Sequence, residues 1–67
     1  EQKELAAELF RAIAQLPDNQ KTAFVLTRLE QLSHAEVSAI MGVSIAAIES
    51  LLHRARTNLK NILENKK

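Results

Sequence analysis

The residues of this sequence best suited to binding chemistry lie in one segment near its C-terminal end. Ser50, His53 and Arg54 follow the only glycine, Gly42, within twelve residues. Hydroxyl, imidazole and guanidinium groups donate hydrogen bonds to phosphate oxygens and to the edges of bases. No nucleophile with an adjacent base, glycine-rich phosphate loop or paired carboxylates accompanies them. The segment therefore indicates binding of an anionic polymer, and we expect no enzyme activity.

The spacing of residues 33–56 is that of two short helices joined by a tight turn. Apolar residues fall where two crossed helices must bury side chains against each other, at Val37, Met41, Val43, Ile48 and Leu51. Gly42 falls in the turn, where a positive φ is needed, and Ser38 provides a small side chain where the helices approach. This pattern is typical of a helix-turn-helix, which places its second helix in the DNA major groove.

Each of these two helices also has a start signal. Ser33 and Glu36 have the S-x-x-E spacing of a capping box. Ser44 is a favourable N-cap for the second helix. The expected helices therefore begin directly after Ser33 and Ser44.

Length and composition restrict the alternatives. The 67 residues are enough for one small domain, and they contain no cysteine and two histidines, so we expect no disulfide, metal site or cofactor. No apolar run approaches the roughly 18 residues of a membrane span, and no segment resembles a signal peptide. We therefore expect a cytoplasmic protein without a membrane partner. Because the sequence begins in a charged helix without methionine, residues 1–67 are interpreted as a C-terminal fragment of a longer protein.

Charge is unevenly distributed along the chain. Residues 1–43 contain four basic and six acidic residues, a net charge of −2, whereas residues 44–67 contain five basic and two acidic residues, a net charge of +3. A phosphate-binding surface requires such a concentration of positive charge. A solvated helix with basic residues near its C-terminus would give the same pattern, so charge alone leaves both interpretations open.

The chain is predicted to be all-α, a small four-helix domain with a C-terminal helix-turn-helix. One glycine and one proline leave little room for other structure, and Pro17 ends the first helix. Helices are expected over residues 2–15, 17–30, 34–41 and 45–63. Helical periodicity predicts that the following apolar residues outside the turn are buried: Leu5, Leu9, Phe10, Ile13, Leu16, Ala23, Phe24, Leu26, Leu29, Ile45, Leu52, Ala55, Leu59 and Ile62 or Leu63.

The pattern from Leu16 to Leu59 resembles region 4 of a bacterial sigma factor of the extracytoplasmic-function type, a winged-helix-like fold without the wing. The resemblance rests on Leu16-Pro17, residues 23–26 with Arg28, Leu32-Ser33, residues 36–38, residues 41–44 and residues 48–56 with Leu59. It covers about two-thirds of the chain. It implies a module that recognises the −35 promoter element in double-stranded DNA and docks on the flap of RNA polymerase core. It also implies an anti-sigma factor as a further partner.

Ten residues are predicted to contact DNA: Ser33, Ser44, Ala46, Ala47, Glu49, Ser50, His53, Arg54, Arg56 and Lys60. Arg54 is the strongest of these, as a contact to a phosphate or a bidentate contact to guanine. Small residues at 46 and 47 let the helix approach the groove, although plain helix propensity explains them equally well. Glu49 either accepts from a cytosine amino group or is a solvated charge. Arg56 and Lys60 are phosphate contacts or solvated charges.

The sequence also departs from the family pattern. Glu49 replaces a residue that is often basic, Leu51 an arginine, Gln31 a glycine and Ser38 an alanine. Glu49 and Leu51 lower the positive charge of the predicted DNA-reading helix over residues 45–63. Weak DNA binding by this domain alone is therefore expected. Two other functions therefore stay open. The chain could be a helix-turn-helix output domain of another transcription regulator, or a sigma-like mimic that binds proteins.

Overall fold

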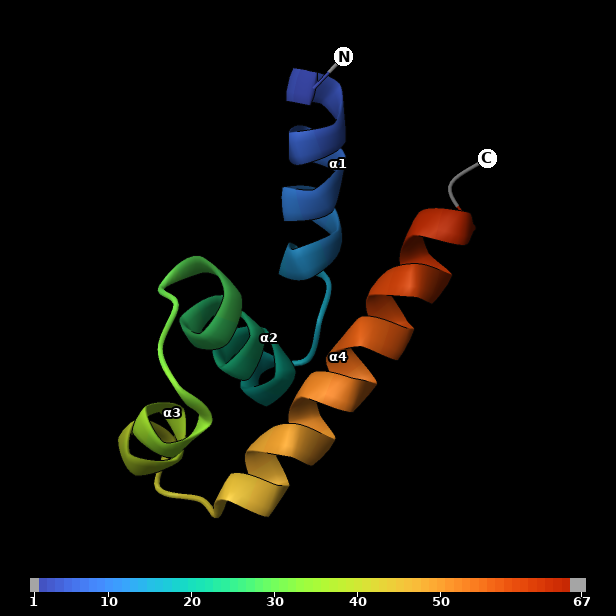
Figure 1. The fold of residues 1–67 in the computed structure, drawn as a ribbon. Helices are drawn as coiled ribbons and strands as arrows, with labels where there is room; N and C mark the ends of the chain where they lie inside the picture. The colour runs from blue at the N-terminus through green and yellow to red at the C-terminus, as the bar shows by residue number, and fades with distance from the viewer. Residues whose placement is uncertain (1, 66–67) are drawn as a thin grey trace.

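In a computed structural model, the chain is a set of helices connected by short turns (Figure 1). The structure describes the backbone of residues 2–65 and the side chains of residues 6–65. Its elements are α1 (Gln2–Ala14), α2 (Asp18–Phe24), the π-helical turn η1 (Val25–Leu29), α3 (His34–Met41) and α4 (Ile45–Glu64). No strand occurs among the described residues, so the predicted all-α fold with four helices is confirmed.

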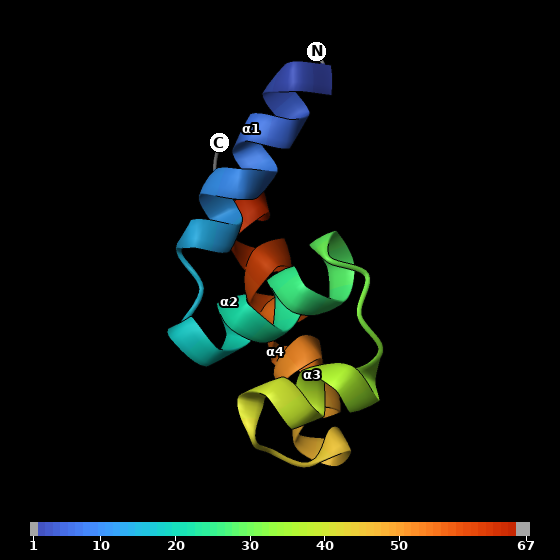
Figure 2. The ribbon, with the colours of Figure 1, turned by 90° about the vertical axis from the view of Figure 1, so that its left-hand side faces the viewer.

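The long helix α4 is the common partner of the other helices. It contacts α1, α2 and α3, which follow one another along its length (Figure 2). The buried apolar side chains form one core cluster made of Ala12, Ile13, Leu16, Ala23, Phe24, Val37, Ile48, Leu52, Ala55 and Leu59. Four of these lie on α4 at intervals of three or four residues, which is the spacing of one helix face. The opposite face of α4 is therefore free to meet a partner.

The connection between α1 and α2 is made at Pro17. The last turn of α1 tightens, because the N–H groups of Gln15 and Leu16 donate to carbonyls three residues back, both at 3.0 Å. Pro17 then serves as the N-cap of α2, and its carbonyl accepts from the N–H of Lys21 at 2.8 Å. Pro17 therefore precedes the second helix, whereas the sequence placed it in the first helical turn.

The second helix ends in a wider turn than the sequence predicted. Its helical path continues to Leu29, close to the expected end, but Val25–Leu29 form a π-helical turn in which the N–H of Glu30 donates to the carbonyl of Val25 at 3.0 Å. The chain then leaves through Gln31, whose φ is 60°. The bend is thus made without glycine, as the sequence required, and Gln31 adopts the left-handed conformation at some conformational cost.

The turn between α3 and α4 has the predicted features. Ser33 and Glu36 form both hydrogen bonds of the capping box, at 2.8 and 3.0 Å. Ser44 caps α4 by accepting from the N–H of Ala47 at 3.0 Å. Gly42 has a φ of 71°, and the hydroxyl of Ser38 donates to the carbonyl of Val43, so Ser38 supplies a hydrogen bond as well as small size.

Several predicted core residues are wrong. Five of them are exposed, namely Leu9, Phe10, Leu29, Val43 and Ile45, whereas of the alternatives Ile62 and Leu63 it is Ile62 that packs on the core. Among the described side chains of α1, only Ala12 and Ile13 belong to the core cluster, and Phe10 is 55% exposed. A groove between α1 and η1 leaves Leu9 and Leu29 uncovered. Val43 and Ile45 adjoin the turn, where fewer helices can cover a side chain. Leu26, Met41, Leu51 and Ile62 pack on the edge of the core, while Leu5 lies outside the described side chains.

A Gly42→Ala substitution tests the conformational role of this glycine. An added Cβ would meet no atom within 4 Å, so the substitution costs only backbone conformation. We expect a loss of about 1–2 kcal/mol in the free energy of unfolding, measured by urea denaturation. Gly42→Asn is the matched control, because asparagine tolerates the left-handed region, and it should cost clearly less. Equal stability of Gly42→Ala and the parent chain would contradict this account.

Candidate nucleic-acid interface

Helices α3 and α4 are arranged as a helix-turn-helix. Their axes are bent by 101° at the turn, within the range of about 90–120° for such pairs. Val37 of α3 and Ile48 of α4 are both fully buried and belong to the same core cluster. The buried contacts fix the angle between the helices, so the outer face of α4 projects from the domain as a rigid surface.

The first half of that outer face is lined by small and polar residues. Ala46, Glu49 and Ser50 are exposed, and Ala47 is half-buried. Ile48 and Leu52 point into the core, so the 3.6-residue period directs Ala46 and Ser50 away from it. These short side chains allow another molecule to approach the helix backbone closely. The major groove, about 12 Å wide, admits an α-helix with such a surface.

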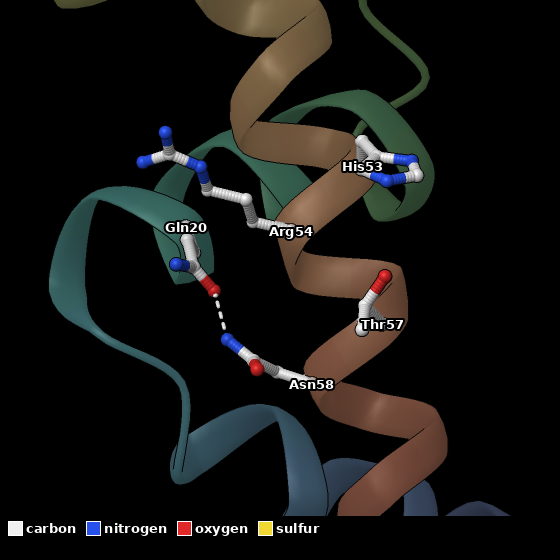
Figure 3. A pocket seen from close by; sticks show the side chains of 5 residues that line it. All are labelled: Gln20, His53, Arg54, Thr57 and Asn58. Atoms are coloured by element: carbon white, nitrogen blue, oxygen red, sulfur yellow. Dashed lines mark hydrogen bonds between the residues drawn. The ribbon is translucent and has the colours of Figure 1, made fainter.

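The next turns of α4 carry the basic part of this face. His53 and Arg54 are both exposed and line a pocket of about 310 Å³ together with Gln20, Thr57 and Asn58 (Figure 3). Asn58 Nδ2 donates to Gln20 Oε1 at 2.7 Å and thereby joins α4 to α2. The sequence analysis missed Gln20, Thr57 and Asn58. The polar pair after Arg56 on α4 was visible in the sequence, whereas the contribution of α2 depends on tertiary packing.

Glu49 has a partner that the sequence did not predict. His34 Nδ1, in the first turn of α3, lies 3.9 Å from Glu49 Oε2, a contact that is an ion pair only when the imidazole is protonated, and no other contact of this kind occurs among the described residues. The two side chains are 43% and 63% exposed, so the pair contributes little to stability. It places the carboxylate of Glu49 beside the first turn of α3.

Arg56 lies apart from Arg54 although only one residue separates them. Two residues along an α-helix correspond to a rotation of about 200°. Arg56 accordingly lines a second pocket of about 440 Å³ with Leu9, Phe24, Arg28, Leu29 and Leu59, on the side of α4 that faces α1 and η1. Lys60 is exposed one turn beyond Arg56. The ten predicted DNA contacts therefore do not form one continuous surface.

Two of the predicted DNA contacts, Ser33 and Ser44, lie before residues 46–60 and are helix caps. Ser33 caps α3 and Ser44 caps α4, and each hydroxyl oxygen accepts a backbone hydrogen bond. Each O–H can still donate outward, since a hydroxyl both donates and accepts. The caps are compatible with phosphate contacts but are fully explained by helix initiation.

Within residues 6–65, no group of three His, Asp or Glu side chains could hold a metal ion. No single described helix is both long and apolar enough to cross a membrane; only α3 and α4 taken together meet that test, by length and composition alone.

Comparison with known protein families identifies the domain. The sequence model of the family described as Sigma-70, region 4 matches residues 6–59, which is most of the chain. The chain belongs to the Sigma-70 region 4 family. The match includes all of α2, η1 and α3 and the first three-quarters of α4, so it covers the helix-turn-helix and the helices that support it.

Named relatives of this region 4 domain are extracytoplasmic-function (ECF) sigma factors. Over 59 residues, 88% of this chain, it is 37% identical to the ECF RNA polymerase sigma factor SigE of Mycolicibacterium smegmatis and 41% identical to SigM of Bacillus subtilis. It is 36% identical, over the same share, to the ECF RNA polymerase sigma-E factor of Escherichia coli K12. The chain spans 23%, 36% and 31% of these three proteins, respectively.

These comparisons confirm the resemblance drawn from the sequence. The domain is a Sigma-70 region 4 domain, and the relatives that share it are ECF sigma factors. Membership also favours this interpretation over the output domain of an unrelated regulator. The ten proposed contact residues stay predictions, now with defined places on the surface.

Proposed function

We propose that this domain recognises the −35 promoter element with the first half of α4 and docks on the flap of RNA polymerase core. The observation that carries the proposal is the outer face of α4 within a helix-turn-helix of the sigma region 4 family. Ala46 and Ser50 allow close approach to the base edges, and Arg54 supplies a fixed positive charge one turn further. The names of the relatives, all RNA polymerase sigma factors, support the same assignment.

The side of α4 that faces α1 and η1 fits the polymerase contact. Leu9, Leu29 and Leu59 give this groove an apolar floor, and Arg28 and Arg56 flank it. Because Arg56 points about 200° away from Arg54, a protein seated in the groove would leave the DNA-facing side of α4 uncovered. The domain can then hold DNA and polymerase at the same time. An anti-sigma factor that covers either surface would prevent initiation.

A chimeric sigma factor tests this function. The matched segment of Bacillus subtilis SigM is replaced by this chain, and the rest of SigM is kept. We expect the chimera to initiate transcription with RNA polymerase core in vitro. The DNA sequence that the chimera needs at the upstream promoter element should differ from the one that SigM needs. The sequence needed at the downstream element should stay the same, because only the upstream-reading domain has been exchanged.

Two measurements separate failure of DNA recognition from failure of docking. Binding of the chimera to polymerase core is measured by co-purification, and start-site choice by run-off transcription on promoters with altered upstream elements. A folded chimera that binds core but shows no preference for any upstream element would refute promoter reading. Absence of core binding would refute flap docking. Core binding without any DNA affinity would favour the protein-binding mimic, for which the acidic Glu49 is the motivating feature.

A further inference from the structure

The pocket between α2 and the middle of α4 has the composition of an anion site. It is lined by Gln20 of α2 and by His53, Arg54, Thr57 and Asn58 of α4 (Figure 3). Each of these five side chains contains an N–H or O–H group that can donate, and none is acidic. Arg54 adds a permanent positive charge. The pocket is open to solvent, so it can receive a group that belongs to a larger molecule.

Gln20 is held rigidly in this pocket. It is 8% exposed, and it is the only polar residue among the buried residues of the described chain. Its Oε1 accepts from Asn58 Nδ2 at 2.7 Å, which leaves both N–H groups of its Nε2 without a protein partner among the hydrogen bonds of the described residues. A donor already fixed in place loses little conformational entropy when it binds a ligand.

The pocket lies further along α4 than the residues proposed at the base edges. Arg54 and Asn58 lie four and eight residues after Ser50, or about 6 and 12 Å along the helix axis. A recognition helix contacts base edges with its N-terminal residues, so its later turns lie nearer the DNA backbone. Arg54 and Gln20 lie on the same side of α4 (Figure 3). With α4 in the groove, both side chains would face the same strand of the DNA duplex.

We propose that this pocket binds one backbone phosphate of the promoter duplex and that Gln20 of α2 is a DNA contact. Arg54 supplies the charge, Gln20 Nε2 supplies a neutral hydrogen bond, and Asn58 is a positioning residue that orients Gln20. Phosphate contacts set the register of a protein on the duplex. Helix α2, which lies outside the helix-turn-helix, would thus fix how deeply α4 enters the groove. This inference rests on the proposed function.

A Gln20→Glu substitution tests the pocket with little change in shape. A carboxylate oxygen still accepts from Asn58 Nδ2, but the free Nε2 donor becomes a negatively charged oxygen that repels phosphate. The matched control is Gln15→Glu, an equal charge change at an exposed residue that does not line the pocket. We expect Gln20→Glu to weaken binding at least about tenfold and Gln15→Glu about twofold. Binding is measured by fluorescence anisotropy on a duplex selected by the parent chain from a random library.

Asn58→Asp is a second variant that keeps the test valid if Gln20→Glu does not fold. It preserves the shape of the side chain but places a negative charge beside Gln20, and it should weaken DNA binding at least about fivefold. If Arg54→Ala weakens binding but Gln20→Glu and Asn58→Asp both equal Gln15→Glu, the pocket is refuted and the DNA function stands. If the parent chain binds no duplex, both are refuted.

Neutral phosphates locate the contact on the DNA. Each phosphate of the duplex is replaced in turn by a methylphosphonate, and the loss in affinity is measured for the parent chain and for Gln20→Glu. One replacement should weaken the parent about tenfold, and the same replacement should cost Gln20→Glu little, because the lost interaction is shared. Equal losses for both proteins at every phosphate would overturn the proposal.

Discussion

The chain with Ile48→Ala is expected to lose most of its folded population at room temperature. Ile48 is fully buried at the crossing of α3 and α4, in the same cluster as Val37 and Leu52. Truncation of a buried isoleucine to alanine costs about 2–5 kcal/mol, because apolar contacts are lost and a cavity is left. A domain of this size rarely has more than about 3–5 kcal/mol from its core. Far-ultraviolet circular dichroism during urea and thermal denaturation measures the loss.

Ile45→Ala is the matched control for this prediction. It makes the same chemical change in the same helix, three residues earlier, at a side chain that is 46% exposed. Its effect on the free energy of unfolding should be within about 1 kcal/mol. The periodic pattern of the sequence placed both isoleucines in the core and therefore predicts that both substitutions destabilise the fold. The structure predicts that only Ile48→Ala does. Equal destabilisation by the two substitutions would contradict the structure.

The local features of the fold could be predicted because each depends on a few neighbouring residues. The capping box of Ser33 and Glu36, the cap at Ser44 and the positive φ of Gly42 all follow from short-range chemistry. The same is true of the helix-turn-helix spacing, since Val37 and Ile48 could be assigned to the buried contact from their separation alone. The family resemblance added the function that spacing could not provide.

Burial was predicted wrongly for side chains whose exposure depends on how far a neighbouring helix extends beside them. Periodicity identifies the apolar face of α1 but not the length over which α4 covers it, so Phe10 was misplaced. It also gives no sign that Val25–Leu29 form a π-helical turn, because the side chains fit an α-helix equally well. The link between Gln20 and Asn58 joins residues 38 apart in sequence and could not be found without the tertiary structure.

The surface of α4 divides the predicted DNA contacts into two groups. Ala46, Ser50, His53 and Arg54 are exposed on the outer face of α4, and the last two line the pocket with Gln20, whereas Arg56 lies beside the apolar groove of α1 and η1. The carboxylate of Glu49 lies near His34 of α3. The sequence treated these charges as one basic segment. The structure indicates that the positive charge available for DNA on this face is concentrated at Arg54, which makes this residue the most informative one to replace.

Arg54→Ala should weaken binding to duplex DNA by about ten- to a hundredfold at constant salt. A charge-assisted or bidentate arginine contact contributes about 1–3 kcal/mol, and each 1.4 kcal/mol corresponds to a factor of ten. The melting temperature should not change, because Arg54 is exposed and has no ion pair among the described residues. Arg56→Ala removes the same group from the other side of α4 and should weaken binding only about twofold. Equal effects of the two substitutions would show that net charge, rather than the face of α4, determines binding.

The salt dependence and Arg54→Lys then identify which DNA group Arg54 contacts. If Arg54 pairs with a phosphate, Arg54→Ala should lower the slope of log affinity against log salt by about 0.9, and Arg54→Lys should restore most of the affinity, since the charge is kept. If Arg54 forms a bidentate pair with guanine, lysine should restore little and discrimination at one base pair should be lost. The pocket with Gln20 favours the first result. Unchanged affinity of Arg54→Ala at every salt concentration would remove Arg54 from the interface.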